Sequence, residues 1–142
     1  MLTDYFIAFQ AELTKLDIRS SPASTHPGVQ AKGADTVKLA TLQRILAMAV
    51  DQPELSTLHS SLVNKPTAEG PWVFAVAPAV TQALARLTVP EVHDVALEWV
   101  ETREWRLDRG DEQTVTDLLS GLQGLAQRAR AEGKEIFLWM SL

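Results

Sequence analysis

The chain has 142 residues, with 18 acidic and 13 basic side chains, a formal net charge of −5 and no cysteine. This length is typical of one globular domain covering residues 1–142, and the lack of cysteine excludes disulfides, thiolate metal cages and a cysteine nucleophile. The acidic balance also argues against nucleic acid as a partner, because phosphate backbones are bound by clustered lysine and arginine.

The sequence predicts a cytoplasmic protein without membrane contact. No apolar run approaches the ~18–20 residues that cross a bilayer. The N-terminal region carries Asp4 where a signal peptide would carry a basic residue.

The first half of the chain predicts three helices and one long loop. Apolar residues at steps of three and four predict a helix over residues 4–17 (Phe6, Phe9, Leu13 and Leu16). Residues 18–35 hold two prolines, two glycines and few apolar side chains, which predicts a mobile loop. Two further helices are expected over residues 36–50 and, beginning at a proline, over residues 53–62.

The second half predicts two strands and three helices. Residues 72–76 and 135–140 are short runs that are apolar on both faces, which favours buried strands. Helices are expected over residues 78–87, 88–104 and 111–133. The second of these begins with a capping box formed by Thr88 and Glu91.

The two buried strands determine the predicted fold class. Their backbone N–H and C=O groups need partners inside the core, so the strands at 72–76 and 135–140 should share a sheet. We therefore predict a mainly helical α+β fold, with about six helices on both sides of a small sheet that includes these two segments.

The C-terminal half resembles the small bacterial YfbM-like domains. The resemblance rests on the run Val73-Phe74-Ala75-Val76-Ala77-Pro78 leading into a helix, on two further helices, and on the run 128–139, in which the long final helix ends and an apolar strand closes the chain. It consists of pattern more than of invariant chemistry. It implies an α/β bacterial domain without an established function, and it transfers no catalytic residue to this chain.

The side chains that usually carry chemistry form no known motif. His26, His59 and His93 lie in three separate segments, without the spacing of a metal site. There is no nucleophile elbow and no glycine-rich phosphate loop. We therefore predict no catalytic residue, no metal site and no cofactor, and favour a protein that is not an enzyme.

One charged surface stands out between residues 91 and 117, where nine carboxylates accompany three arginines. On a helix that turns about 100° per residue, Asp94, Glu98 and Glu101 share one sector, and Trp105 falls on the same stripe if the helix extends that far. This surface has three alternative interpretations: a solvated helix face, a docking face for a basic partner, or a metal or acid–base site. An exposed tryptophan among charges is typical of a binding hot spot.

These observations favour a non-catalytic protein-binding module, of an adaptor or immunity-like kind, that uses Asp94, Glu98, Glu101 and Trp105 to bind a basic protein. The alternative is a small-ligand-binding protein or enzyme with a pocket between the sheet ends and the loop at residues 20–33, where His26 and His59 would meet carboxylates. A third alternative is a homo-oligomer that associates through the helix at 36–50 or through an uncovered strand edge at 135–140.

Overall fold

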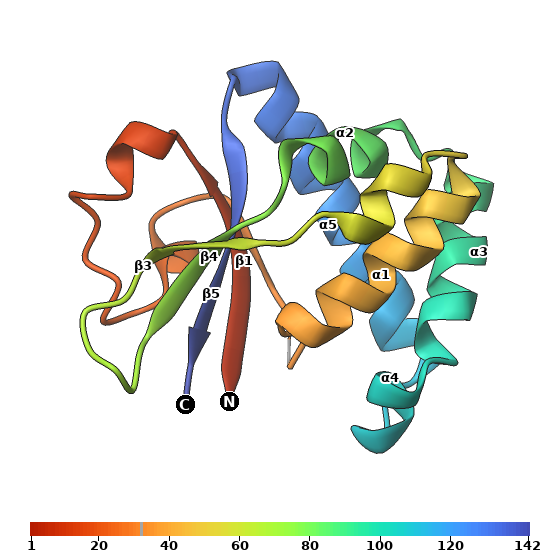
Figure 1. The fold of residues 1–142 in the computed structure, drawn as a ribbon, viewed down its shortest axis with the longest axis horizontal. Coiled ribbons are helices and arrows are strands. Elements are labelled where there is room, and N and C mark those ends of the chain that lie inside the picture. Colours follow the sequence, from red (N-terminus) through yellow and green to blue (C-terminus); the bar gives the residue numbers. More distant parts are fainter. Residues whose placement is uncertain (32) are drawn as a thin grey trace.

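A five-stranded antiparallel sheet forms the centre of the molecule (Figure 1). The computed structural model describes residues 1–31 and 33–142. The strands run in the spatial order β2-β1-β5-β4-β3, so that the N-terminal and C-terminal strands lie side by side. Their bounds are β1 Leu2–Ala8, β2 Gly28–Gln30, β3 Ser61–Asn64, β4 Trp72–Ala75 and β5 Glu135–Ser141.

Five α-helices accompany the sheet within the part of the chain that the structure describes. They are α1 Thr36–Ala49, α2 Pro78–Arg86, α3 Val89–Val100, α4 Arg103–Leu107 and α5 Glu112–Glu132. Three short 3₁₀ helices lie in the connections: η1 Gln10–Glu12, η2 Pro22–Ser24 and η3 Pro53–Thr57.

The two faces of the sheet have different cover (Figure 1). The α-helices pack on one face, where Tyr5 and Ile7 of β1 join the larger apolar cluster. The opposite face holds a smaller cluster, in which Phe6, Phe137 and Trp139 of the sheet meet apolar side chains from the segment 9–27. The prediction of helices on both sides of the sheet is therefore wrong, because an irregular segment covers the second face.

Several predicted elements are confirmed. The runs at 72–76 and 135–140 form β4 and β5, which pair directly with each other. Helices α1, α2 and α5 lie where the periodicity placed them. The capping box at the start of α3 is present, with the Thr88 hydroxyl accepting from the Glu91 N–H and the Glu91 carboxylate accepting from the Thr88 N–H.

The predicted helix over residues 4–17 is wrong, because this segment forms most of β1, an interior strand of the sheet, and the short helix η1. The prediction of a helix was based only on Phe6 and the apolar residues after it. Tyr5 and Ile7 are also buried, on the other face of the same strand. A run that is apolar on both faces suits a strand between two neighbours, and β1 lies between β2 and β5.

Two other segments of the first half also differ from expectation. The segment 53–62 is helical only in η3 and then continues toward β3, so no α-helix forms there. The predicted loop at 18–35 contains η2 and the edge strand β2, which pairs with β1. Both strands were missed because each is short: β2 depends on pairing with the distant β1, and β3 is largely exposed and pairs with β4, the next strand along the chain.

The count of about six helices is wrong, since two predicted helices are absent and one was divided. The helix predicted over 88–104 ends at Val100, and α4 begins after Thr102. The hydroxyl of Thr102 donates to the Trp99 carbonyl at 2.6 Å, in addition to the Thr102 N–H at 3.1 Å, so Thr102 closes the end of α3.

The expected free edge at 135–140 is also wrong, because β5 pairs with β1 on one side and with β4 on the other. Within the described sheet, the border strands are β2 and β3. Among the helices described, none combines the length and the apolar character needed to cross a membrane.

Candidate functional site

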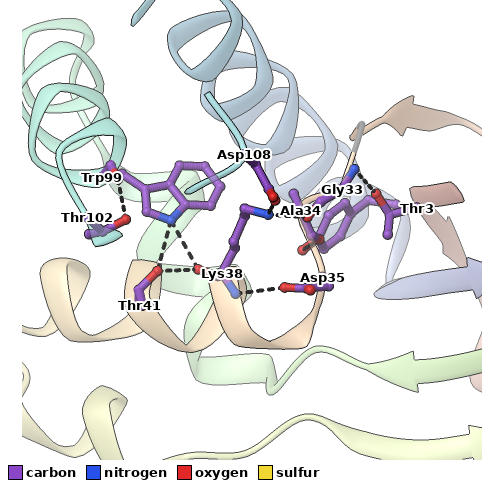
Figure 2. Close-up of polar contacts among 10 residues, drawn as sticks. Thr3, Gly33, Ala34, Asp35, Lys38, Thr41, Trp99, Thr102 and Asp108 are labelled. Atoms are coloured by element: carbon purple, nitrogen blue, oxygen red, sulfur yellow. Dashed lines mark hydrogen bonds and ion pairs between the residues drawn. The ribbon is translucent and has the colours of Figure 1, made fainter. Parts of the chain in front are cut away.

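A group of mostly buried polar contacts, with Asp108 at its exposed border, joins the start of α1 to β1, to α3 and to the turn after α4 (Figure 2). We call it the Lys38 cluster. Its members are Thr3, Tyr5, Gly33, Ala34, Asp35, Lys38, Thr41, Trp99, Trp105 and Asp108.

Lys38 is buried, with 4% of its side chain exposed. Its ammonium donates to the Gly33 carbonyl at 2.8 Å and to the Asp108 carboxylate. The same nitrogen lies 4.8 Å from the ring centre of Trp105. A carbonyl, a carboxylate and an aromatic face therefore surround the charge, which offsets part of the cost of removing it from water.

Two tryptophans pack against this part of α1, edge to face with ring centres 5.4 Å apart. The indole N–H of Trp99 donates to the Lys38 carbonyl at 3.0 Å and to the Thr41 hydroxyl at 3.2 Å. The indole N–H of Trp105 is buried and has no hydrogen-bond partner among the described residues. Hydrogen bonds therefore hold the Trp99 ring in addition to packing, whereas packing and the contact with the Lys38 ammonium hold the Trp105 ring.

Strand β1 fixes the segment before α1 from the other side (Figure 2). The Tyr5 hydroxyl donates to the Ala34 carbonyl at 2.9 Å, and the Thr3 hydroxyl accepts from the Gly33 N–H at 2.7 Å. Burial raises the pKa of Tyr5 well above its ordinary value, and the nearby Asp35 carboxylate raises it further. Tyr5 is therefore held as a neutral hydrogen-bond donor.

The Lys38 cluster acts as a structural centre. A lysine used in catalysis needs a neutral amine that can reach a substrate. Here the ammonium has a carboxylate and a carbonyl as neighbours and is closed to solvent. Its contacts join α1 to the segment that precedes it and to the turn after α4.

The predicted docking residues lie in different surroundings. Asp94 and Glu98 on α3 are exposed and take part in no ion pair within the described chain. Glu101 is also exposed and pairs with Arg106. Trp105 is 3% exposed, so its prediction as a surface residue is wrong. The chain turns at Thr102, which rotates Trp105 away from the acidic stripe and into the core.

The three histidines do not meet at a common site. The ring nitrogen Nε2 of His26 lies 3.2 Å from a carboxylate oxygen of Glu12. His59 lines a separate pocket of about 260 Å³ beside α1, and His93 is exposed on α3. The hydrogen bond from the Phe9 N–H to Glu12, followed by the contact with His26, lowers the pKa of that carboxyl group.

A surface pocket of about 530 Å³ lies at the end of the sheet where β1 begins and β5 ends. We call it the sheet-end pocket. It lies on the face away from the α-helices, between the strand ends and the start of the segment that leads to η2. Its lining includes Asp4, Arg19, Ser20, Gln30, Trp139 and Ser141.

The pairing of β1 with β2 and β5 determines which side chains form the floor of this pocket. Asp4 is directly opposite Gln30 on one side and Trp139 on the other. Residues opposite each other in antiparallel strands project on the same face. Phe6, two residues after Asp4, belongs to the cluster on the face away from the helices, so Asp4 projects on that face too.

The wall of the pocket comes from the segment that follows η1. The indole N–H of Trp139 donates to the Ile18 carbonyl at 2.8 Å and thereby fixes the segment against the sheet. Arg19 lines the pocket, but its guanidinium makes two hydrogen bonds to Asp17, at 2.8 and 3.0 Å. These bonds lower the pKa of Asp17 to about 2.

Three polar side chains of the pocket have no side-chain partner within the described part of the chain. They are the carboxylate of Asp4, the amide of Gln30 and the hydroxyl of Ser20. The alternative expectation from the sequence is a pocket between the sheet ends and residues 20–33 that includes His26 and His59. The sheet-end pocket includes Ser20 and Gln30 but neither histidine, so the histidine part of that expectation is wrong. Asp4 and Trp139 were missed as lining residues, because their meeting depends on the pairing of the two ends of the chain.

No group of three or more metal-ligating side chains occurs among the residues described. No family model matches the chain, and no curated protein and no solved structure matches it. The resemblance to YfbM-like domains therefore stays a prediction.

Proposed function

We propose that this chain is a small-molecule-binding protein whose ligand occupies the sheet-end pocket. The observation that carries the proposal is the meeting of Asp4, Ser20 and Gln30 in a pocket of about 530 Å³, each without a side-chain partner in the described structure. Pockets of roughly 300–1,000 Å³ with a few converging polar groups are typical of small-molecule sites.

The location of the pocket supports the proposal. Its floor consists of β1, β2 and β5, which are fixed by antiparallel pairing. Its wall is held to the floor by the hydrogen bond between Trp139 and Ile18. Rigid strands can hold Asp4 and Gln30 in place before a ligand arrives, which lowers the entropic cost of binding.

A thermal-shift screen with a broad set of small metabolites tests the proposal. Ser20→Trp should fill the pocket from its wall, and Ser120→Trp places the same ring on the exposed surface of α5 as a matched control. We expect some compounds to raise the melting temperature of the wild type and of Ser120→Trp, but not of Ser20→Trp. A ligand present at 100 times its Kd stabilises the folded state by about 2.7 kcal/mol.

Two results would contradict the proposal. The first is that no compound in the screen raises the melting temperature of the wild type. The second is that Ser20→Trp, while folded, responds to the same compounds as the wild type, because the ligand would then bind elsewhere.

A second candidate function is the docking of a basic protein on α3. It is favoured by Asp94 and Glu98, which lie four residues apart, are exposed and have no ion-pair partner in the described chain. Like charges at this spacing repel each other by a few tenths of a kcal/mol, roughly 0.2–0.5. A basic partner would remove this repulsion and would gain from the negative field of the whole chain.

A pair of charge reversals tests this second candidate. Asp94→Lys with Glu98→Lys should abolish capture of a basic protein from native lysate. Glu54→Lys with Glu69→Lys changes the net charge equally at exposed positions outside α3, and should leave capture intact. Equal capture by the wild type and the α3 variant would exclude this face, and equal losses in both variants would indicate non-specific charge attraction.

A further inference from the structure

We infer that the ligand of the sheet-end pocket carries a protonated amino group, which the Asp4 carboxylate binds. This inference rests on the proposed function and adds the chemical class of the ligand. It depends on which charged side chains of the pocket are already paired and which are not.

The two charged side chains that line the pocket differ in their partners. Arg19 uses its guanidinium for two hydrogen bonds to Asp17, and its own backbone N–H donates to the same carboxylate at 3.0 Å. Asp4 has no cation and no side-chain hydrogen bond within the described residues, although it is partly buried on the pocket floor. Among the described side chains that line the pocket, Asp4 is therefore the one charged group without a charged partner.

The neighbours of Asp4 suit a donor group of the ligand. Gln30 lies directly opposite Asp4 in the register, and its amide oxygen can accept a second hydrogen bond. Ser20 supplies a hydroxyl at the wall. An ammonium group has three donors, so a carboxylate, an amide oxygen and a hydroxyl can together satisfy it.

A metal ion is a poorer occupant for the same charge. Calcium takes six to eight oxygen ligands, often from several carboxylates, and magnesium also needs a nearly complete oxygen shell. Asp4 is the one carboxylate among the pocket-lining side chains, and no metal-ligating group of three or more occurs in the described structure. The pocket is also large for a single ion, at about 530 Å³.

Three probes test the inference. Glucosamine and glucose share a ring and differ in one amino group, and spermidine supplies amines without a sugar. Isothermal titration with the full chain should show that glucosamine binds at least about tenfold more tightly than glucose, because a charge-assisted hydrogen bond contributes about 1.5–3 kcal/mol and tenfold is 1.4 kcal/mol.

Substitutions at Asp4 and at a distant acid assign the site. Asp4→Asn keeps the shape of the side chain and should remove the preference for glucosamine and the binding of spermidine. Glu69→Gln removes one negative charge at an exposed position outside the pocket and should change neither. If Asp4→Asn does not fold, Gln30→Ala should weaken glucosamine binding several-fold.

Each outcome decides the inference. Equal binding of glucose and glucosamine, or an unchanged preference in Asp4→Asn, overturns the amine assignment. Loss of spermidine binding in Glu69→Gln alone places the amine outside the sheet-end pocket and also overturns it. If none of the amine probes binds, the assignment is wrong, whereas other ligands excluded by Ser20→Trp would leave the proposed function standing.

Discussion

Tyr5 and Asp4 are neighbours on β1, yet their side chains enter two regions with opposite properties. Tyr5 projects to the helical side, where its hydroxyl donates to the Ala34 carbonyl within the Lys38 cluster. Asp4 projects to the other side, onto the floor of the sheet-end pocket, and has no side-chain partner in the described structure. One strand therefore borders a region where most polar groups have protein partners and a region where Asp4, Ser20 and Gln30 have no side-chain partner in the described structure.

The difference indicates where stability and binding reside. A buried polar group that has its partners contributes to folding, and its removal leaves other buried groups unpaired. A polar group at a pocket surface is satisfied by water, so it adds little to folding and remains available to a ligand. Substitutions in the Lys38 cluster should therefore change the free energy of unfolding, and those in the pocket should change binding.

The largest expected effect is that of Lys38→Ala. It removes a buried side chain, the cation that Gly33 and Asp108 contact, and the charge on the face of Trp105. We expect a loss of about 2–4 kcal/mol in the free energy of unfolding, measured by urea denaturation. Lys15→Ala, at an exposed position, is the control and should have almost no effect. A loss below about 1 kcal/mol for Lys38→Ala would contradict the structural role.

Tyr5→Phe should have the next largest effect. It removes the hydroxyl and leaves the buried carbonyl of Ala34 without this partner. We expect the free energy of unfolding at neutral pH to fall by about 1–2 kcal/mol. A value near zero would show that the hydrogen bond contributes nothing net.

The pH dependence of the free energy of unfolding also tests the role of the Tyr5 hydroxyl, because burial raises the pKa of Tyr5 in the folded state. The unfolded chain releases this proton above about pH 10 and the folded chain retains it. The stabilisation is complete below that pH and declines above it, by about 1.4 kcal/mol per pH unit. Tyr5→Phe should lack this part of the decline.

Tyr5 is the single tyrosine of the chain, so the ultraviolet band of phenolate reports on it alone. The band should appear together with unfolding as the pH rises. Phenolate in the folded protein near pH 10 would mean that the hydroxyl is accessible to water.

The two tryptophans of the cluster provide a smaller, matched comparison. Trp99→Phe and Trp105→Phe remove the same atoms from two buried rings. The first change also removes hydrogen bonds to the Lys38 carbonyl and the Thr41 hydroxyl, and the second removes an N–H without a partner in the described structure. Trp99→Phe should therefore cost about 1 kcal/mol more, by urea denaturation. Equal losses would mean that packing alone holds both rings.

The smallest expected effect is that of Asp4→Asn. Because Asp4 has no side-chain partner in the described chain, the free energy of unfolding should change by less than about 0.5 kcal/mol. Urea denaturation of Asp4→Asn and of Tyr5→Phe, measured side by side, compares the contributions of two neighbouring residues on opposite faces of one strand. A loss as large as that of Tyr5→Phe would show that Asp4 serves folding.

Local signals in the sequence were sufficient for the elements whose stability is local. The capping box of Thr88 and Glu91 and the apolar stripe of α5 each lie within one helix, and both are confirmed. For β1 the residues carried two patterns. Phe6, Phe9 and Leu13 fit a helix, while Thr3, Tyr5 and Ile7 alternate as in a strand, and pairing with β5 decided between them.

The candidate site was harder to predict because it depends on contacts between distant segments. Asp4 and Trp139 meet only through the register of β1 with β5. The error at Trp105 arose from continuing one helix past Thr102, where a break of a few residues changes the direction of every later side chain. Thr102 is a common type of residue at the start of a helix, and it was the available signal for that break.

The border strand β3 has a consequence for how the protein behaves when concentrated or heated. Its outer side pairs with no strand in the described sheet, and Leu62 and Val63 are exposed on it. Two features discourage a neighbouring molecule from extending the sheet here. The register shifts between Leu62 and Asn64, and Lys65 and Pro66 follow directly. An irregular edge, a positive charge and a residue without an N–H all oppose the addition of a strand, so this hairpin protects one border of the sheet from edge-to-edge association.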